Sequence, residues 1–333
     1  MTGRLIKRFA VAAAVGLLAS GCATGTKSPP ASAGSVASTA AKSSATPSPS
    51  ASATAAAAPV PQLLILGDGV SGGMGLWGFE ARNRWTALAS VPEATGIARF
   101  GEQVAISSGR SVDLRSAGTP GTPGTALPVK WPRDTPTRTI VGLAESPAGN
   151  VAMVTVDGES QGYWLAAPSG TVEVLQPAPS QAFTPLVAWL DDARLLVLTT
   201  DVDQVSRLAV IDVAAQTIHP SKSVAGVRYF ALSPDRRTLA VVTEAKVYAD
   251  PVETFLGSNQ PSVVAGIDPS TLVWGLAFDD SGRELALFSG TLAADGHVVA
   301  VRETGYAKGS ASWTMAFDSP APFSRAIDQV WLP

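Results

Sequence analysis

A unit of about 45 residues recurs between residues 62 and 333, and this repeat constrains the fold more than any other feature. Each copy has an apolar start that contains alanine, then a polar turn, then an apolar run rich in Val, Leu and Ile. The alanine falls at Ala98, Ala144, Ala188, Ala231 and Ala277, at spacings of 46, 44, 43 and 46 residues, and a weaker copy contains Ala326. Short strands at this period are typical of a β-propeller with four strands per blade.

The two ends of the repeat region predict how the ring closes. The last copy stops at Pro333 after its first strand or two, whereas residues 62–96 have the pattern of later strands. RWTALASV from Arg84 also resembles SWTMAFDS from Ser312, the last strand of the preceding copy. We therefore expect an all-β propeller of six four-stranded blades in which N- and C-terminal strands share one blade. Seven blades is the alternative.

Two copies of the repeat carry a family resemblance. SPDRRTLAVVT from Ser233 and FDDSGRELALFSG from Phe278 resemble the repeat of WD40-like propellers of the TolB type, which also occurs in actinobacterial lipoproteins. The other copies are degenerate, and the copy at Ala98 lacks the SPDG-like turn. The resemblance implies a rigid disc that displays loops for binding, and it implies no particular ligand.

The first 21 residues have the pattern of a bacterial lipoprotein signal peptide. Arg4, Lys7 and Arg8 precede an apolar run from Phe9 to Ala19, which is too short to cross a bilayer. LLASGC then ends at Cys22, the single cysteine of the chain, and resembles a lipobox with alanine where leucine is most common. The resemblance implies that Cys22 carries acyl chains such as palmitate. It implies an anchor on the extracytoplasmic face of the cell membrane.

Residues 22–61 predict a tether rather than a folded domain. After Cys22 they are almost entirely Ala, Ser, Thr, Pro, Gly and Val, with no aromatic and no acidic residue. Such a segment buries too little apolar surface to fold, so we expect it to be disordered. The propeller domain is then residues 62–333. Because one cysteine permits no internal disulfide, this domain must be stable through packing alone.

Charge argues against nucleic acid as a partner. The formal net charge is −3, and no basic run of the kind that follows phosphates is present. We expect a monomeric domain that touches the membrane only through its lipid.

GDGVSGG, which begins at Gly67, contains the G-x-S-x-G pattern of a nucleophile elbow at Ser71. VDGESQG lies two periods later, so Asp68 and Ser71 align with Asp157 and Ser160. A catalytic serine is needed once, whereas a hairpin turn recurs in every blade. We therefore interpret both segments as turns between second and third strands.

Other polar candidates also have the pattern of structural residues. His219 and His297 are the only histidines, and with a lipidated cysteine they make a zinc site improbable. Carboxylates at Asp191, Asp192, Asp235, Asp279 and Asp280 fall in equivalent turns between first and second strands. The pair Asp201 and Asp203 lacks the rest of a calcium loop. We predict no metal, no cofactor and no catalytic residue.

The eight tryptophans allow two interpretations. Trp85 and Trp313 fall at matching strand starts, and Trp77 and Trp164 nearly do, which indicates packing between blades. One or two could instead line a carbohydrate or peptide groove. The segments that depart most from the repeat, 116–136 and 246–261, are further candidate loops.

Two functional hypotheses follow. The favoured one is a lipid-anchored binding or scaffold module for a protein or cell-envelope ligand, with candidate ligand-face residues Asp68, Ser71, Asp157, Ser160, Trp77 and Trp164. The alternative is a propeller enzyme of the lactonase, glycosidase or lyase class. It would require acidic, histidine or asparagine side chains that converge at the central channel, and the sequence shows no such unrepeated set.

Overall fold

The computed structural model describes most of residues 63–331. The described residues are 63–80, 84–132, 138–157, 160–177, 186–200, 203, 205–268, 272–278, 281–282, 284–292, 298–307, 314–319 and 326–331. The chain divides into two units, Met1–Ala56 and Ala57–Pro333. The signal peptide, Cys22 and the tether therefore lie outside the described residues.

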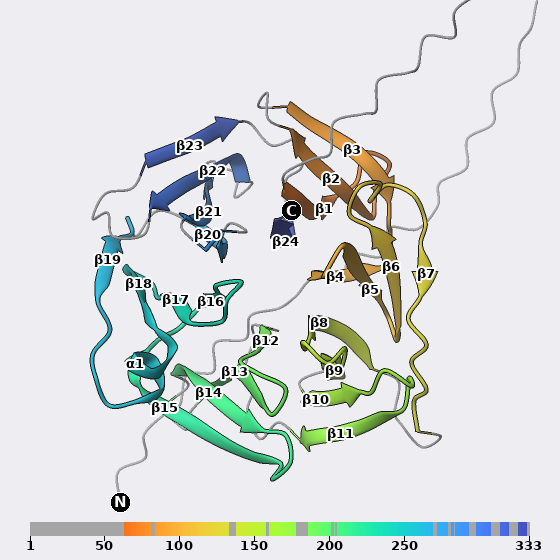
Figure 1. Cartoon of the computed structure of the whole chain (residues 1–333). Coiled ribbons are helices and arrows are strands. Elements are labelled where there is room, and N and C mark those ends of the chain that lie inside the picture. Colours follow the sequence, from red (N-terminus) through yellow and green to blue (C-terminus); the bar gives the residue numbers. More distant parts are fainter. Residues whose placement is uncertain are drawn as a thin grey trace, which may run out of the picture. The chain divides into compact units, whose positions relative to one another are not determined.

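Within the described part of the second unit, the strands form six four-stranded antiparallel sheets arranged in a ring (Figure 1). Sheet 1 contains β24 (Ala326–Trp331), β1 (Leu63–Asp68), β2 (Met74–Glu80) and β3 (Arg84–Ser90). Sheet 2 contains β4 (Ala94–Phe100), β5 (Gln103–Ser108), β6 (Ser111–Ser116) and β7 (Thr125–Ala126). Sheet 3 contains β8 (Thr139–Glu145), β9 (Val151–Asp157), β10 (Ser160–Ala166) and β11 (Val172–Pro177).

The second half of the ring continues in chain order. Sheet 4 contains β12 (Val187–Trp189), β13 (Arg194–Thr200), β14 (Ser206–Asp212) and β15 (Thr217–Ala225). Sheet 5 contains β16 (Tyr229–Leu232), β17 (Thr238–Val242), β18 (Lys246–Pro251) and β19 (Val263–Gly266). Sheet 6 contains β20 (Leu272–Phe278), β21 (Glu284–Leu292), β22 (Val298–Ala307) and β23 (Thr314–Ser319). The short helix α1 (Val252–Leu256) follows β18.

This arrangement confirms the predicted all-β propeller. Sheets 2–6 are each built from one continuous stretch of chain, whereas sheet 1 combines both ends. β24 pairs with β1, with Leu64 opposite Val330 and Ile65 opposite Gln329. The two ends of the repeat region therefore share one sheet, as the incomplete copies at 62–96 and 326–333 indicated. No seventh sheet occurs among the described strands.

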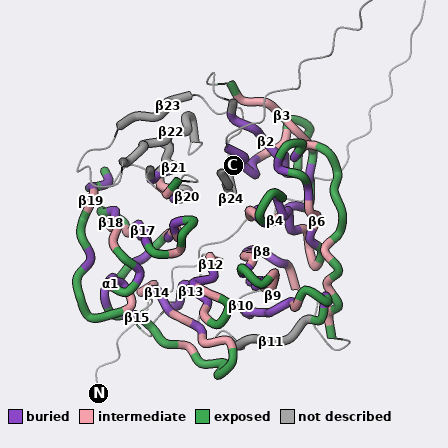
Figure 2. Tube along the Cα trace, viewed as in Figure 1, coloured by how far each residue is buried: buried purple, intermediate pink, exposed green. Residues whose placement is uncertain are grey.

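The core lies between neighbouring sheets rather than at the centre of the ring. Separate apolar clusters fill the spaces between sheets 1 and 2, 2 and 3, 3 and 4, 4 and 5, and 5 and 6. Every residue of β17 is buried, because a middle strand has a neighbouring sheet on each face. Figure 2 shows buried residues concentrated within the strands, whereas exposed residues lie in the turns and along the outer edge of the ring.

Directional bonds fix how neighbouring sheets are oriented. The buried Tyr163 hydroxyl of sheet 3 donates to the Leu198 carbonyl of sheet 4 at 2.9 Å. The indole Nε1 of Trp189 in β12 donates to the Ala144 carbonyl of β8 at 3.1 Å. Such bonds have strict geometry, whereas apolar contact alone would tolerate small rotations between sheets.

No helix in the described part of the chain is long and apolar enough to span a bilayer.

Candidate functional site

The ring has two faces, defined by its turns. The innermost strands are β4, β8, β12, β16, β20 and β24, several of which contact their neighbours around the centre. Turns that join first to second strands, such as 146–150 and 233–237, lie on one face, which we call the inner-turn face. Turns that join second to third strands, such as 69–73, lie on the opposite face, which we call the hairpin face.

A cavity of about 940 Å³ lies at the centre of the inner-turn face. Its wall consists of the C-terminal ends of β4, β8, β12, β16 and β20 together with the turns that follow several of them. The five repeated alanines, Ala98, Ala144, Ala188, Ala231 and Ala277, all line it. A side chain that ends at Cβ takes little volume, so the alanine column that marks the repeat also keeps the centre open.

Among the described residues, four charged ones line this cavity. Arg99 comes from the end of β4, Glu102 from the turn after β4, Glu145 from the end of β8, and Arg236 from the turn between β16 and β17. Burial raises the pKa of the Glu145 carboxyl, and the positive charge of Arg236 offsets part of that rise. These described side chains offer both positive and negative groups, which suits a ligand with groups of both signs.

Arg236 has two unusual features. Its φ is 59°, in the left-handed region that side chains rarely adopt. Its Nη1 is shielded from solvent and has no hydrogen-bond partner among the described residues. Sequence reasoning did not select Arg236 or Glu145, although SPDRR carries arginine where SPAG and DDSG carry glycine.

The carboxylates predicted to lie in first turns are used to build those turns. Asp191 accepts hydrogen bonds from the backbone N–H of Ala193 and from Nε of Arg194. Partial burial acts to raise the pKa of Asp191, but these bonds outweigh it and hold the pKa below its usual value. Asp192 accepts the backbone N–H of Ala148 from the neighbouring sheet at 2.9 Å. Asp279 and Asp280 lie outside the described residues.

The structure places the two serine turns in different sheets. The turn with Ser71 joins β1 to β2, and the turn before Ser160 joins β9 to β10, so both are second-to-third turns as predicted. Sheet 2 lies between them in the ring (Figure 1), so no single site contains both. Ser71 is exposed beside a small cavity of about 220 Å³. The side chains of Asp157 and Ser160 lie outside the described residues.

The two tryptophans proposed for the ligand face are buried. Trp77 and Trp164 are each 5% exposed. Trp77 donates its indole N–H to the Asp68 carbonyl, and Trp164 donates to Thr155 Oγ1. Trp164 also packs edge-on against Trp131, with ring centroids 5.4 Å apart. Both rings are therefore buried, in agreement with the packing role that the sequence indicated for the tryptophans.

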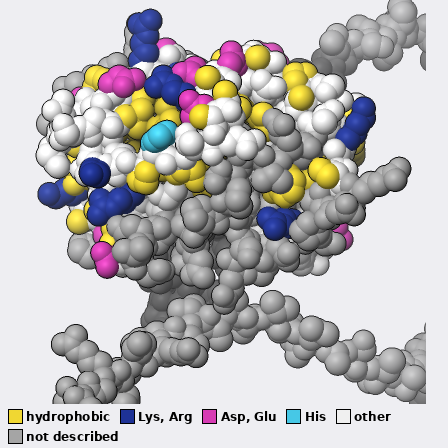
Figure 3. All heavy atoms as spheres, turned by 90° about the horizontal axis from the view of Figure 1, so that it is seen from below, with side chains coloured by type: hydrophobic (Ala, Val, Ile, Leu, Met, Phe, Trp, Pro, Cys, Tyr) yellow, Lys and Arg dark blue, Asp and Glu magenta, His cyan; other side chains and the backbone are white. Residues whose placement is uncertain are grey.

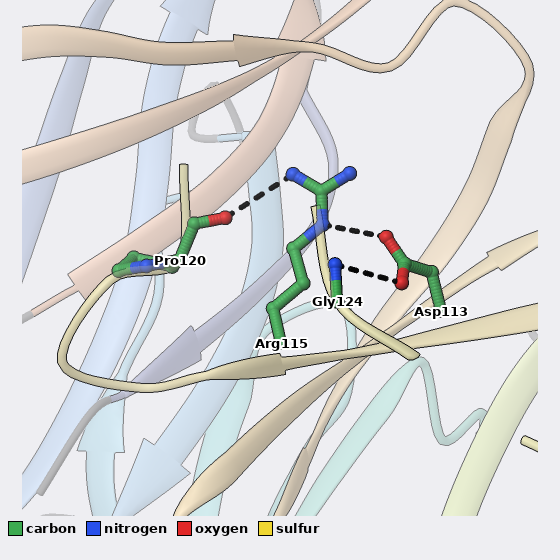
Figure 4. A network of polar contacts seen from close by, with 4 residues as sticks. All are labelled: Asp113, Arg115, Pro120 and Gly124. Atoms are coloured by element: carbon green, nitrogen blue, oxygen red, sulfur yellow. Dashed lines mark hydrogen bonds and ion pairs between the residues drawn. The ribbon is translucent and has the colours of Figure 1, made fainter. Parts of the chain in front are cut away.

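The two irregular segments are held by their own contacts. Figure 4 shows the start of segment 116–136, where Arg115 Nε donates to Asp113 Oδ2 and Nη1 donates to the Pro120 carbonyl. The Gly124 N–H donates to the second Asp113 oxygen. Segment 246–261 contains β18 and α1, and the buried Phe255 carbonyl accepts from Ser223 Oγ at 2.7 Å.

The remaining candidates are dispersed. His219 is exposed on β15, beside Thr217 Oγ1, and Asp203 is exposed. His297, Asp201 and Cys22 lie outside the described residues. Among the described residues, no three His, Cys, Asp or Glu side chains are grouped to hold a metal ion. In the view of Figure 3, acidic and basic side chains are interspersed rather than gathered by sign.

Comparison with solved structures supports the fold. TolB from Acinetobacter baumannii is similar with a TM-score of 0.59 at 11% identity, over 81% of this chain and 66% of that one. The putative TolB from Agrobacterium tumefaciens is similar with a TM-score of 0.52 at 13% identity, over 82% of this chain and 99% of that one. No family model and no curated protein matches the sequence. At these identities the likeness shows the β-propeller fold alone.

Proposed function

We propose that the chain is a binding or scaffold module: a β-propeller, anchored by lipid on the extracytoplasmic face of the membrane, that holds part of a protein or cell-envelope ligand in its central cavity. The observation that carries this proposal is the convergence of the five repeat alanines on one cavity, whose described lining contains side chains of both charges. Volumes of 300–1,000 Å³ are typical of ligand pockets.

The chemistry of the cavity supports binding rather than catalysis. Its two acidic residues, Glu102 and Glu145, come with two arginines, Arg99 and Arg236. The one histidine among the described residues, His219, lies on the outermost strand of sheet 4, away from the cavity. The likeness of the fold to the TolB proteins is consistent with a binding role.

The test uses a substitution that fills the cavity. Ala231→Phe adds a large ring to the wall, and we expect it to abolish ligand capture from envelope extracts while the circular dichroism spectrum stays that of wild type. The matched control is Ala214→Phe, in the exposed turn between β14 and β15, which should capture the ligand normally. Equal capture by both variants would reject the cavity as the binding site.

A second control addresses the serine turn. Ser71→Ala should leave capture unchanged, because Ser71 lies on the hairpin face. Loss of capture in this variant alone would move the site to that face.

A further inference from the structure

Four of the described turns on the inner-turn face contain a residue with positive φ, and in one of them this residue is not glycine. Gly101, Gly149 and Gly282 adopt φ values of 53°, 79° and 64° in the first turns of sheets 2, 3 and 6. Sheet 5 has Arg236 in the corresponding first turn, with φ 59°. Gln216 is the only other non-glycine residue with positive φ among the described residues.

A side chain at this position is unfavourable for the turn. Cβ approaches the following carbonyl in the left-handed region, whereas glycine adopts that conformation freely. The turn itself does not need arginine: Asp235 Oδ1 accepts from Ser233 Oγ and from the Arg237 N–H, and Ser233 Oγ accepts from the Thr238 N–H. Residues kept in a strained conformation occur preferentially at functional sites.

The side chain of Arg236 has an unused hydrogen-bond donor at the wall of the cavity. It lines the cavity, and its Nη1 is shielded from solvent without a hydrogen-bond partner in the described part of the chain. A buried donor without an acceptor is costly, and a turn of the guanidinium toward a ligand in the cavity would supply the acceptor and recover that cost. Burial raises the pKa of the Glu145 carboxyl from sheet 3 and the positive charge of Arg236 offsets part of that rise, but the two side chains do not form an ion pair.

Resting on the proposed function, we propose that Arg236 is the anion-binding residue of the cavity and that the ligand presents a carboxylate to it. Guanidinium forms two parallel hydrogen bonds with a planar carboxylate. A multiply charged phosphate fits less well, because Glu102 and Glu145 line the same cavity and would repel the extra charge.

The test separates turn strain from ligand binding by comparing Arg236→Gly with Gln216→Gly. Each substitution places glycine where a residue with a side chain has a positive φ, which removes backbone strain. Both variants should therefore raise the thermal midpoint of the ligand-free protein, by about 2 °C for a domain of this size. Acetate and inorganic phosphate serve as probes, titrated at constant ionic strength, because a ligand that binds only the folded state raises the midpoint. Acetate should stabilise wild type and Gln216→Gly in a saturable way, and its apparent affinity should fall at least tenfold in Arg236→Gly.

Arg236→Lys keeps the charge but removes the planar fork, so its affinity for acetate should lie between those of wild type and Arg236→Gly. Three results would each overturn the inference: equal stabilisation of Arg236→Gly by acetate, stronger stabilisation of wild type by phosphate than by acetate, or a lower midpoint of ligand-free Arg236→Gly. If Arg236→Gly also captures the envelope ligand as wild type does while Ala231→Phe does not, the inference fails and the proposed function stands.

Discussion

Arg115 shows how single residues hold an irregular segment to this fold. Its side chain is 9% exposed, so its charge must be matched by groups within the protein. Its guanidinium donates hydrogen bonds to the Asp113 carboxylate and to the Pro120 carbonyl. The second oxygen of the Asp113 carboxylate accepts a hydrogen bond from the backbone N–H of Gly124. One ion pair thereby holds the loop that links β6 to β7 at Pro120 and at Gly124.

Asp113→Ala removes this match and leaves the guanidinium with too few acceptors. We expect the free energy of unfolding to fall by about 2 kcal/mol, the usual cost of losing hydrogen bonds to a charged group. Urea denaturation measures the effect. Glu244→Ala is the matched control, because it breaks the exposed pair with Arg228 and should cost under about 0.5 kcal/mol. Equal losses in the two variants would contradict this account of Arg115.

Glu145 makes stability depend on pH. Burial raises its pKa above the ordinary value of 4.5, so the folded chain binds this proton more tightly than the unfolded chain. The contribution to the free energy of unfolding is therefore full below pH 4.5 and is lost as the pH rises through the folded pKa. Glu145→Gln should remove this part of the decline, measured as the urea midpoint from pH 4 to 7. Glu244→Gln should leave the decline intact.

The strands and turns could be predicted well from the sequence, because nearby residues determine them. Asp, Gly, Pro and Ser favour the turns, and the Val, Leu and Ile runs favour strands with both faces buried. The second-to-third turn at Ser71 could be identified because a copy exists at Ser160. The cavity could not be predicted in the same way. It depends on which alanines face the centre and on the backbone conformation of Arg236, and both depend on how neighbouring sheets pack.

At the scale of elements, β24 closes the ring by backbone pairing with β1. Without it, β1 would present an open edge of unpaired N–H and C=O groups. Val330→Pro removes a donor from β24, and we expect destabilisation of about 3 kcal/mol and faster amide exchange in β1. Val330→Ala keeps the backbone donor, so it separates the pairing from side-chain packing. If the two variants behave alike, backbone pairing does not determine closure.

For the whole molecule, the position of the cavity bears on how an anchored propeller would meet its ligand. Core clusters between sheets make the ring rigid, and the cavity of about 940 Å³ on the inner-turn face lies at its axis. The tether predicted for residues 22–61 would allow the ring to turn its inner-turn face toward partners at varied distances from the membrane.

The anchor is tested by Cys22→Ala. If Cys22 carries two or more acyl chains, the wild-type protein should sediment with membranes and the variant should appear in the soluble extracytoplasmic fraction, because no second anchor is expected. Mass spectrometry of the N-terminal peptide identifies the modification directly. Ser20→Ala is the matched control, because a small residue two positions before the cysteine still fits the lipobox, so this variant should remain lipidated and bound. Membrane retention of Cys22→Ala at the wild-type level would reject the lipid anchor while leaving the cavity and its ligand to be judged separately.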